Sequence, residues 1–438
     1  MAWRDEYDQK LMSFTDAARL IRAGDVVYTP IGGDARSFMP AVFARIAELE
    51  FRVRVRACAP QAQDWFLPEY WDLPIEFSVE IFGGNLSRAA LAARRADFYP
   101  QLFSNQFNLY DSRPDDQEPI DVFIAHCTPP DDEGYVTFGG MPWHKGDFTR
   151  RADRTILEVS PWLPNVRTTE RVHVSEVAAF VMTELTERPA VAVTVPPPET
   201  ITIAGYVNEI VQDGDTCQIG AGRTATHLVP SGAFAGKRDI GWHSEITPLG
   251  VVPLMMSGVI NNSRKSVDTG VGVTTTVSPR SDEEHEWLET SGLLDTRPVR
   301  EVNSIVNVAA QERMCSINNA FAVDLTDQIC DESLGTVVYN GTGGQPENHI
   351  GAFLSKGGKA ITLLSSTALD GVVSRIVPQL EAGSLVTIPR FYADFIVTEF
   401  GIARLLGKNH RERAEALIAV AHPNFREELK HAARKLFG

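Results

Sequence analysis

The chain has 438 residues, of which 43% are hydrophobic, so it is too long for one compact core and is expected to form two domains. Its formal net charge of -16 at pH 7 argues against non-specific nucleic-acid binding, which depends on Lys and Arg neutralising phosphates. The N-terminal residues are charged where a secretory signal would be apolar, and no run of eighteen or more apolar residues follows. These features predict a soluble, cytoplasmic protein with neither a membrane nor a nucleic acid as its partner.

Short apolar runs, many of them β-branched, alternate with helix-like segments along the whole chain. This alternation predicts an α/β fold with largely parallel, buried sheets. Near the C-terminus, Asn409 and Glu412 have the spacing of a capping box and predict the start of the C-terminal helix. The runs expected to form strands are residues 52–58, 122–127, 191–195, 216–220, 336–339, 360–366, 384–388 and 394–399.

Three consecutive prolines, Pro196 to Pro198, cannot continue a helix or a sheet interior and place the domain junction near residue 195. We therefore expect an N-terminal domain of residues 1–195 and a C-terminal domain of residues 196–438. The cysteines are odd in number, scattered and without CxxC spacing, which predicts reduced thiols and no metal site. They are Cys58, Cys127, Cys217, Cys315 and Cys330.

The two halves share a sequence pattern at an offset of about 190 residues. Ala23–Val26 leading to Ile31–Gly33 recurs as Asp213–Thr216 leading to Ile219–Gly222. A second similarity joins residues 122–136 with 361–373, each an apolar strand followed by small polar residues, Asp and Gly. The pattern predicts two similar domains with mixed or parallel sheets that face each other across an active-site cleft.

A glycine-containing turn, residues 219–225, follows the expected strand 216–220 and precedes a stretch that can begin a helix. Backbone amides there could bind a phosphate, and the pattern also fits the G-x-G-x-x-A of a dinucleotide site. The acidic residue at a suitable distance, Glu245, does not end an apolar strand as a ribose-binding carboxylate should. A tight turn that binds no ligand is the simplest alternative.

A second glycine-rich segment, residues 339–345, has three glycines within four residues, which predicts a loop that exposes backbone N–H groups. Such groups could stabilise an oxyanion, although a surface turn would also explain the glycines. Lys356 and Lys359 flank a further glycine pair and could meet phosphates, or could simply be solvated. A third segment, His243-Ser244-Glu245, is no hydrolase triad, because sequence neighbours rarely take the required geometry.

Taken in order, these segments resemble the acetyl-CoA hydrolase/CoA-transferase family, which includes acetate- and 4-hydroxybutyrate-utilising CoA-transferases. The similarity is strong in the second half of the chain and thinner in the first, and it covers nearly all of it. In the second half it is carried by residues 297–299, 314, 316–318, 323–325, 332–333, 341–345, 355–359, 374–380, 397–403 and 421–429. In the first half it rests on residues 129–131, 134–135 and 173–176.

The resemblance assigns roles to particular residues. It implies that Glu245 is the catalytic carboxylate, and that Asn303 and Gly344 are oxyanion donors. It also implies that the 220–224 turn binds coenzyme A and not a dinucleotide. The residues expected to bind CoA are Gly220, Ala221, Gly222, Arg223, Thr224, Asn318, Gly341 and, from the glycine pair above, Lys359.

The implied reaction is a ping-pong transfer of CoA between an acyl-CoA and a carboxylic acid through a glutamyl-CoA thioester on Glu245. The reaction needs no tightly bound cofactor and no metal, since CoA is a substrate. The resemblance also suggests that the protein forms a homodimer or a larger homo-oligomer. Residues 246–250 and 346–348 depart from the family pattern, so we expect an acyl group other than acetate. The alternatives are an acyl-CoA hydrolase, a dinucleotide-dependent oxidoreductase and a non-catalytic acyl-CoA binding protein.

Overall fold

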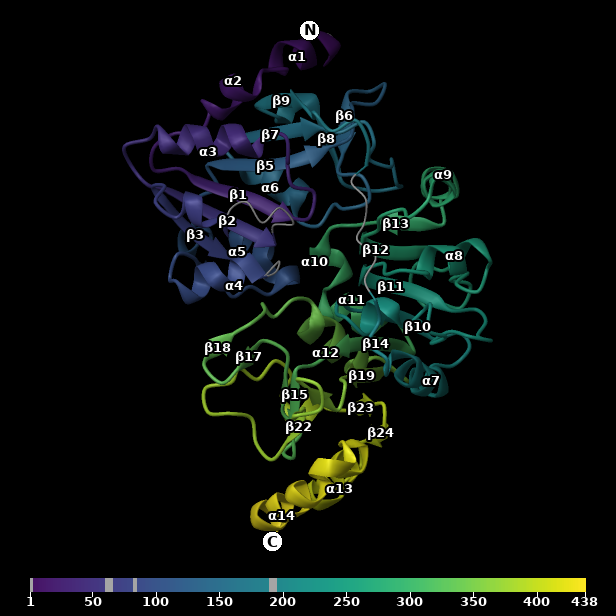
Figure 1. Cartoon of the computed structure of the whole chain (residues 1–438). Helices are drawn as coiled ribbons and strands as arrows, with labels where there is room; N and C mark the ends of the chain where they lie inside the picture. The colour runs from purple at the N-terminus through teal and green to yellow at the C-terminus, as the bar shows by residue number, and fades with distance from the viewer. Residues whose placement is uncertain (1–2, 60–65, 82–84, 189–194) are drawn as a thin grey trace. The chain divides into compact units, whose positions relative to one another are not determined.

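The computed structural model describes residues 3–59, 66–81, 85–188 and 195–438. The chain divides into unit 1, residues 1–191 and 275–301, and unit 2, residues 192–274 and 302–438. Each unit is an α/β fold built on a largely parallel sheet, which confirms the predicted fold class (Figure 1).

The sheet of unit 1 has the strand order β4-β3-β2-β1-β5-β7-β9, and its neighbouring strands run parallel. Most of its central strands are apolar and buried along their length, as is usual when both faces of a parallel sheet are covered. Its elements are α1 (Trp3–Lys10), α2 (Phe14–Ala18), β1 (Val26–Ile31), α3 (Met39–Ala47), β2 (Val53–Ala59), β3 (Ile75–Val79), α4 (Asn85–Ala92), β4 (Asp97–Phe98), α5 (Gln106–Ser112), β5 (Val122–Cys127), β6 (Tyr135–Thr137), α6 (Lys145–Arg151), β7 (Arg154–Val159), β8 (Arg171–His173), β9 (Ala179–Met182), α9 (Asp282–Thr290), β13 (Leu294–Thr296) and the start of α10 (Val299–Val302).

In unit 2 the strands follow the order β12-β11-β10-β14-β19-β23-β24. The strands β10, β11, β14, β19 and β23 are parallel, and β24 closes the edge in the antiparallel direction. Its elements are α7 (Thr200–Ile210), β10 (Thr216–Ile219), β11 (Gly241–Ile246), α8 (Val251–Met256), β12 (Gly272–Thr276, which ends in unit 1), α11 (Ile305–Ala310), β14 (Met314–Asn319), β15 (Ala322–Asp324), β16 (Ile329–Cys330), β17 (Ser333–Leu334), β18 (Val337–Val338), α12 (Gln345–Leu354), β19 (Lys359–Leu363), β20 (Thr367–Ala368), β21 (Val373–Ser374), β22 (Ile376–Val377), β23 (Phe395–Thr398), β24 (Gly401–Arg404), α13 (His410–Val420) and α14 (Arg426–Phe437).

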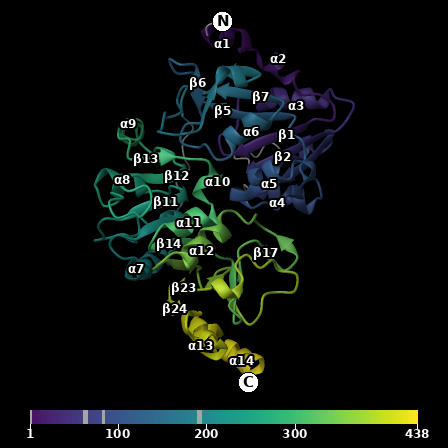
Figure 2. The same ribbon diagram turned by 180° about the vertical axis from the view of Figure 1, so that it is seen from behind.

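The helix start predicted near the C-terminus is confirmed. The Asn409 side chain accepts from the N–H of Glu412, and the Glu412 carboxylate accepts from the N–H of Asn409. The helix that begins there, α13, is followed by α14, which packs beside it in both views (Figure 1 and Figure 2). The capping box therefore begins the penultimate helix and not the last one.

Most predicted strands are present, with two exceptions among the described residues. Residues 384–388 form no strand, because their N-terminal half is held by side-chain hydrogen bonds and only Ile388 makes a β-bridge. Residues 336–339 shorten to the two residues of β18, which pair with β17 in a separate hairpin. The predicted strand 191–195 lies outside the described residues except for its last residue.

The repeat seen in the sequence has a structural counterpart at the amino end of the central strand of each unit. Asp25 precedes β1, accepts a hydrogen bond from the N–H of Arg22 at 2.7 Å and pairs with Arg154 at 2.9 Å. Asp215 precedes β10, accepts from the N–H of Gln212 at 2.8 Å and pairs with Arg313 at 2.8 Å. The same buried carboxylate thus anchors the same strand in both units.

The second sequence similarity does not join equivalent strands. The strand β5 lies next to β1, whereas β19 is separated from β10 by β14. By position, β5 corresponds to β14, and β19 corresponds to β7. Asp and Gly recur after many strands because they suit tight turns, so this local likeness carried no information about topology.

Residues 275–301 return to unit 1 although they follow a large part of unit 2 in the sequence. Their backbone is fixed there, since Val277 donates to the carbonyl of Gly140 at 2.8 Å and Val299 to that of Trp143 at 3.1 Å. The expected junction at residue 195 lies four residues from the observed one at residue 191, but the expected C-terminal domain wrongly included this return segment. Residues 275–301 have a higher share of charged residues than the 22% of the whole chain, but charge content does not indicate which unit a segment joins.

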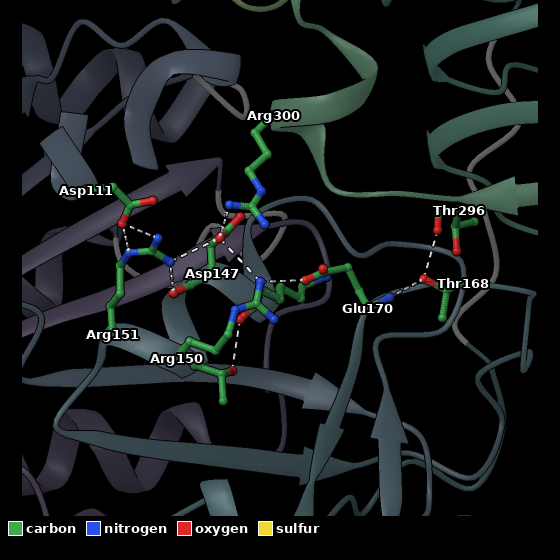
Figure 3. Close-up of polar contacts among 10 residues, drawn as sticks. Asp111, Asp147, Arg150, Arg151, Thr168, Glu170, Thr296 and Arg300 are labelled. Atoms are coloured by element: carbon green, nitrogen blue, oxygen red, sulfur yellow. Dashed lines mark hydrogen bonds and ion pairs between the residues drawn. The ribbon is translucent and has the colours of Figure 1, made fainter. Parts of the chain in front are cut away.

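An ion-pair cluster on α6 also holds the return segment. The fully buried carboxylate of Asp147 meets Arg150 at 3.3 Å, Arg151 at 3.0 Å and Arg300 at 3.2 Å, as Figure 3 shows. Glu170 extends the cluster to Arg150 at 3.3 Å. Because Arg300 comes from the return segment, Asp147 links that segment to the body of unit 1.

The described cysteines are buried and form no disulfide, and Cys217 and Cys315 occupy paired positions on β10 and β14. In the ranges that the structure describes, no helix combines the length and the apolar character needed to cross a membrane.

The Asp147 cluster gives a prediction about stability. Replacing Asp147 with Asn leaves neighbouring guanidinium groups without their buried counter-charge, so we expect the free energy of unfolding to fall by about 3 kcal/mol. Urea unfolding monitored by circular dichroism measures this loss. The control is Asp116→Asn, which removes an exposed pair with Arg113 and should cost less than about 1 kcal/mol. Equal losses in both variants would contradict the role given to Asp147.

Candidate active site in unit 2

The carboxyl ends of the parallel strands β10, β11 and β14 meet at one edge of the unit 2 sheet. The register pairs Thr216 with Gly241 and Ile219 with Ile317, so Gly220, Glu245 and Asn318 all reach this edge. Ligands of open α/β sheets bind outside the carboxyl ends of strands. The sequence-predicted residues from three separate segments are thus brought to the position where a site is expected.

Glu245, near the end of β11, is in contact with two segments that lie much later in the sequence. The Asn303 side chain donates from Nδ2 to Glu245 Oε2 at 2.5 Å. Gly344 lies so close that a Cβ at this position would overlap Glu245 Oε2. The predicted catalytic triplet of Glu245, Asn303 and Gly344 is therefore assembled in one place, within a single unit.

The neighbours of Glu245 in β11 fix the two segments that meet there. His243 is buried, and its Nε2 lies 2.8 Å from the carbonyl oxygen of Val302. A carbonyl only accepts, so Nε2 carries the proton and donates to the residue just before Asn303. Ser244 donates from Oγ to the carbonyl of Ile246 at 2.6 Å, which fixes the backbone on both sides of Glu245.

The surroundings of Glu245 favour its protonated form. Burial and the nearby carboxylate of Glu347 raise the pKa of Glu245, the hydrogen bond from Asn303 lowers it, and the net result is a pKa of about 7. A carboxylic acid with a pKa near neutrality ionises readily at physiological pH and keeps more nucleophilic character than an ordinary surface glutamate. Such a shift is common at catalytic sites.

A pocket of about 730 Å³ lies at the same edge of unit 2. Its walls include Ala221, Gly222, Arg223 and Thr224 of the predicted CoA turn, together with Arg375. The guanidinium groups of Arg223 and Arg375 share this lining with the acidic residues Glu199, Asp331 and Asp370, and burial raises the pKa of Asp331. The two guanidinium groups could bind anionic parts of a ligand in this pocket.

The glycines of the turn are required by close contacts with β14. A Cβ at Gly220 would overlap Asn318 Oδ1, and one at Gly222 would overlap Asn319 Nδ2. The expected helix after the turn is only the single 3-10 turn Ala225–His227, so no α-helix N-terminus points into the pocket. Packing against β14 thus explains why this turn is rich in glycine.

Comparisons with known proteins match nearly the whole chain to one family. The model of the acetyl-CoA hydrolase/transferase N-terminal domain matches residues 1–215, and that of the C-terminal domain matches residues 281–433. A succinyl-CoA:cyclohexane-1-carboxylate CoA transferase from Geobacter metallireducens is 34% identical over 99% of this chain and 97% of its own. The chain belongs to the acetyl-CoA hydrolase/transferase family.

A further relative and a solved structure are also similar to this chain. A 4-hydroxybutyrate coenzyme A transferase from Clostridium kluyveri is 34% identical over 82% of each chain. The structure of RipA from Yersinia pestis superposes with a TM-score of 0.88 at 30% identity, covering 100% of this chain and 99% of RipA. The prediction that this chain is a CoA-transferase enzyme is confirmed at the level of the family, and the dinucleotide interpretation is removed.

Two predicted CoA-binding residues of the acetyl-CoA hydrolase/transferase pattern lie beside the pocket. Asn318 is buried and hydrogen-bonded to Gln218 at 3.0 Å and to Ser316 at 2.8 Å, directly under Gly220. Gly341 is buried and follows Asn340, which lines the pocket. Asn318 therefore supports the turn from below, and its role as a CoA contact stays a prediction.

The structure corrects the assignment of Lys359 as a CoA-binding residue. Lys359 is the first residue of β19, at the amino end of the sheet, and its Nζ pairs with Asp215 at 2.5 Å. This is the position that Arg154 holds at the start of β7, paired with Asp25. Lys356 pairs with the exposed Glu312. Both lysines follow the C-terminal end of α12, about 15 Å from Gly344 at its other end, so neither faces the pocket.

Glu347 and Arg375 were not identified from the sequence. Glu347 is fully buried and accepts from Asn303 Nδ2 at 3.2 Å, although the sequence drew attention to it only as a departure from the family pattern. Arg375 lies within a run that matches the family, but arginines near turns are common and nothing local marks it. The positions of Glu347 and Arg375 in the site are recognised only from the three-dimensional placement of α12 and of the β21–β22 segment.

Gly344 can be tested with a matched glycine. Gly344→Ala keeps an ordinary backbone angle, with φ of -86°, but its methyl group would displace the Glu245 carboxylate. We expect CoA-transferase activity to fall at least about a hundredfold, as when an oxyanion donor is lost, with little change in melting temperature. The control is Gly205→Ala in α7, where a Cβ meets no atom within 4 Å. An active Gly344→Ala enzyme would contradict the close approach.

Proposed function

We propose that this chain moves CoA from an acyl-CoA to a free carboxylic acid by a ping-pong reaction in which Glu245 carries the CoA. The observation that supports this most directly is the contact between Glu245 and Asn303 at 2.5 Å, beside the backbone of Gly344. It places a carboxylate nucleophile against an amide donor in a partly buried setting, at the edge of the sheet where a pocket holds the guanidinium groups of Arg223 and Arg375.

In the first half of the reaction, a carboxylate oxygen of Glu245 attacks the thioester carbonyl of the acyl-CoA. The carbon–sulfur bond breaks, and the products are an acyl-glutamyl anhydride and CoA thiolate. The thiolate then attacks the glutamyl carbonyl, which releases the acyl group as a carboxylate and leaves CoA on Glu245 as a thioester. The Asn303 amide stabilises the negative charge that develops on the oxygen at each attack.

In the second half, an incoming carboxylate repeats these steps in reverse and leaves as a new acyl-CoA. The thioester energy is kept throughout, so the proposed reaction uses no tightly bound cofactor. A carboxylate attacks a thioester slowly, and binding energy from the remote nucleotide part of CoA must bring the reacting atoms together. We assign that binding to the pocket that contains Ala221, Gly222, Arg223, Thr224 and Arg375.

We further propose that the acid is larger or more functionalised than acetate. Residues 246–250, which follow Glu245, depart from the family pattern, and the named relatives act on cyclohexane-1-carboxylate and on 4-hydroxybutyrate. Thr247 is not free to contact a substrate, because its hydroxyl is bonded to Trp242 Nε1 at 3.1 Å and to Thr274 at 2.9 Å. The choice of acid is therefore assigned to other residues of this segment.

The intermediate can be trapped. Incubation with acyl-CoA, followed by borohydride reduction and peptide mass spectrometry, should show a modification on the peptide that contains Glu245. Glu245→Ala should give no such peptide and should lose activity by more than about a thousandfold. Steady release of CoA from the wild-type enzyme in the absence of an acceptor acid would instead identify a hydrolase, and absence of the adduct with several acyl-CoAs would refute the proposal.

The raised pKa of Glu245, about 7, also predicts the pH dependence. The protonated acid cannot attack, so kcat/KM should be low below the pKa and should rise with increasing pH until it levels off above about pH 7. An ordinary glutamate would give a plateau already near pH 5. Initial rates at saturating acceptor between pH 5 and pH 9 measure the acid limb, and a flat profile across this range would exclude Glu245 as the group that must ionise.

A further inference from the structure

The amide of Asn303 lies between two carboxylates. Its Nδ2 donates to Glu245 Oε2 at 2.5 Å and to Glu347 Oε2 at 3.2 Å. Asn303 and Glu347 are both fully buried. Glu347 belongs to the first turn of α12, the helix that begins directly after Gly344. One helix therefore brings Gly344 to Glu245 and a second carboxylate to Asn303.

This arrangement fixes which way the amide points. The nitrogen carries two hydrogens, one for each carboxylate, whereas the buried Oδ1 of Asn303 has no hydrogen-bond partner. Turning the amide by 180° would place Oδ1 against two carboxylate oxygens. The two carboxylates therefore determine the orientation, even though it leaves the buried carbonyl oxygen without a hydrogen bond.

We propose that Glu347 is a positioning residue: it holds one N–H of Asn303 and so keeps the other N–H, which meets Glu245, directed at the reacting carbonyl throughout the reaction. This inference rests on the proposed function. Glu245 loses its negative charge once it becomes an anhydride or a thioester, so it no longer orients the amide strongly. Glu347 forms no covalent bond in the proposed steps and remains an acceptor in every intermediate. The donor is thus already in place when each oxyanion forms, as electrostatic catalysis requires.

Placement on α12 suits this role. A carboxylate in the first turn of a helix is stabilised by the helix dipole, which offsets part of the cost of burying the charge. The helix also ties Glu347 to Gly344 through the backbone, because the Asn348 side chain and its N–H both bond to the carbonyl of Gly344, at 2.9 Å and 3.1 Å. The donor, its orienting group and the glycine loop consequently form one rigid assembly.

The decisive variant is Glu347→Gln, which keeps the shape of the side chain but can donate to Asn303 Oδ1 and so permits the flipped amide. We expect kcat to fall about tenfold to a hundredfold, with KM for acyl-CoA within about twofold, because the CoA pocket is lined by other residues. The acid limb of kcat/KM should move to lower pH, since the like charge beside Glu245 is removed. Glu347→Asp keeps a carboxylate and should recover part of kcat.

Two controls separate positioning from a general structural role. Glu312→Gln in the same unit removes only an exposed pair with Lys356 and should leave kcat and the pH profile unchanged. In an Asn303→Ala background, Glu347→Gln should change kcat by less than about twofold, because the group on which Glu347 acts is absent.

The outcomes distinguish this inference from the proposed function. A wild-type enzyme that forms no glutamyl-CoA adduct would refute the proposed function itself. If the wild type forms the adduct, and Glu347→Gln forms it at the same rate with an unmoved acid limb, the positioning role is overturned. It is also overturned if Glu347→Gln lowers kcat as much in the Asn303→Ala background as in the wild type. Should Glu347→Gln fail to fold, an activity of Glu347→Asp equal to that of Asn303→Ala would count against the inference.

Discussion

The active centre of unit 2 depends on one constraint, the alignment of parallel strands. Because β10, β11 and β14 end at the same edge, a turn, a carboxylate and a pair of asparagines that are far apart in the sequence become neighbours. The helix α12 then adds Gly344 and Glu347 from above that edge. The contact of Glu245 with Asn303 also requires the segment between α10 and α11, which His243 holds through the carbonyl of Val302.

At the amino ends of the strands, charged residues have a structural role in both sheets. Asp25 and Asp215 sit at the amino ends of the central strands and bind the basic residues Arg154, Arg313 and Lys359. These ion pairs lie away from the carboxyl edge and hold the strands in register. In unit 2, structural charges and the reactive carboxylate therefore lie at opposite ends of the parallel strands.

Local chemistry and the family resemblance made different parts of the structure predictable. The capping box at Asn409 could be found because its determinants are three residues apart, and Glu245 could be found because a triplet of residues matched a family. Lys359 was misassigned because a lysine beside glycines looks the same whether it meets a phosphate or a buried aspartate. Glu347 was not assigned because its partner, Asn303, is 44 residues away in the sequence.

The return of residues 275–301 to unit 1 affects the order in which the protein can fold during synthesis. Domains usually fold as units, the N-terminal one first, as the chain leaves the ribosome. Here the first unit lacks Arg300 and the backbone partners of Gly140 and Trp143 until residues 192–274 of the second unit have already emerged. The two units must therefore complete their folding at nearly the same time. Glu301 is the last residue of unit 1, and Asn303, which contacts Glu245 in unit 2, follows it by two positions.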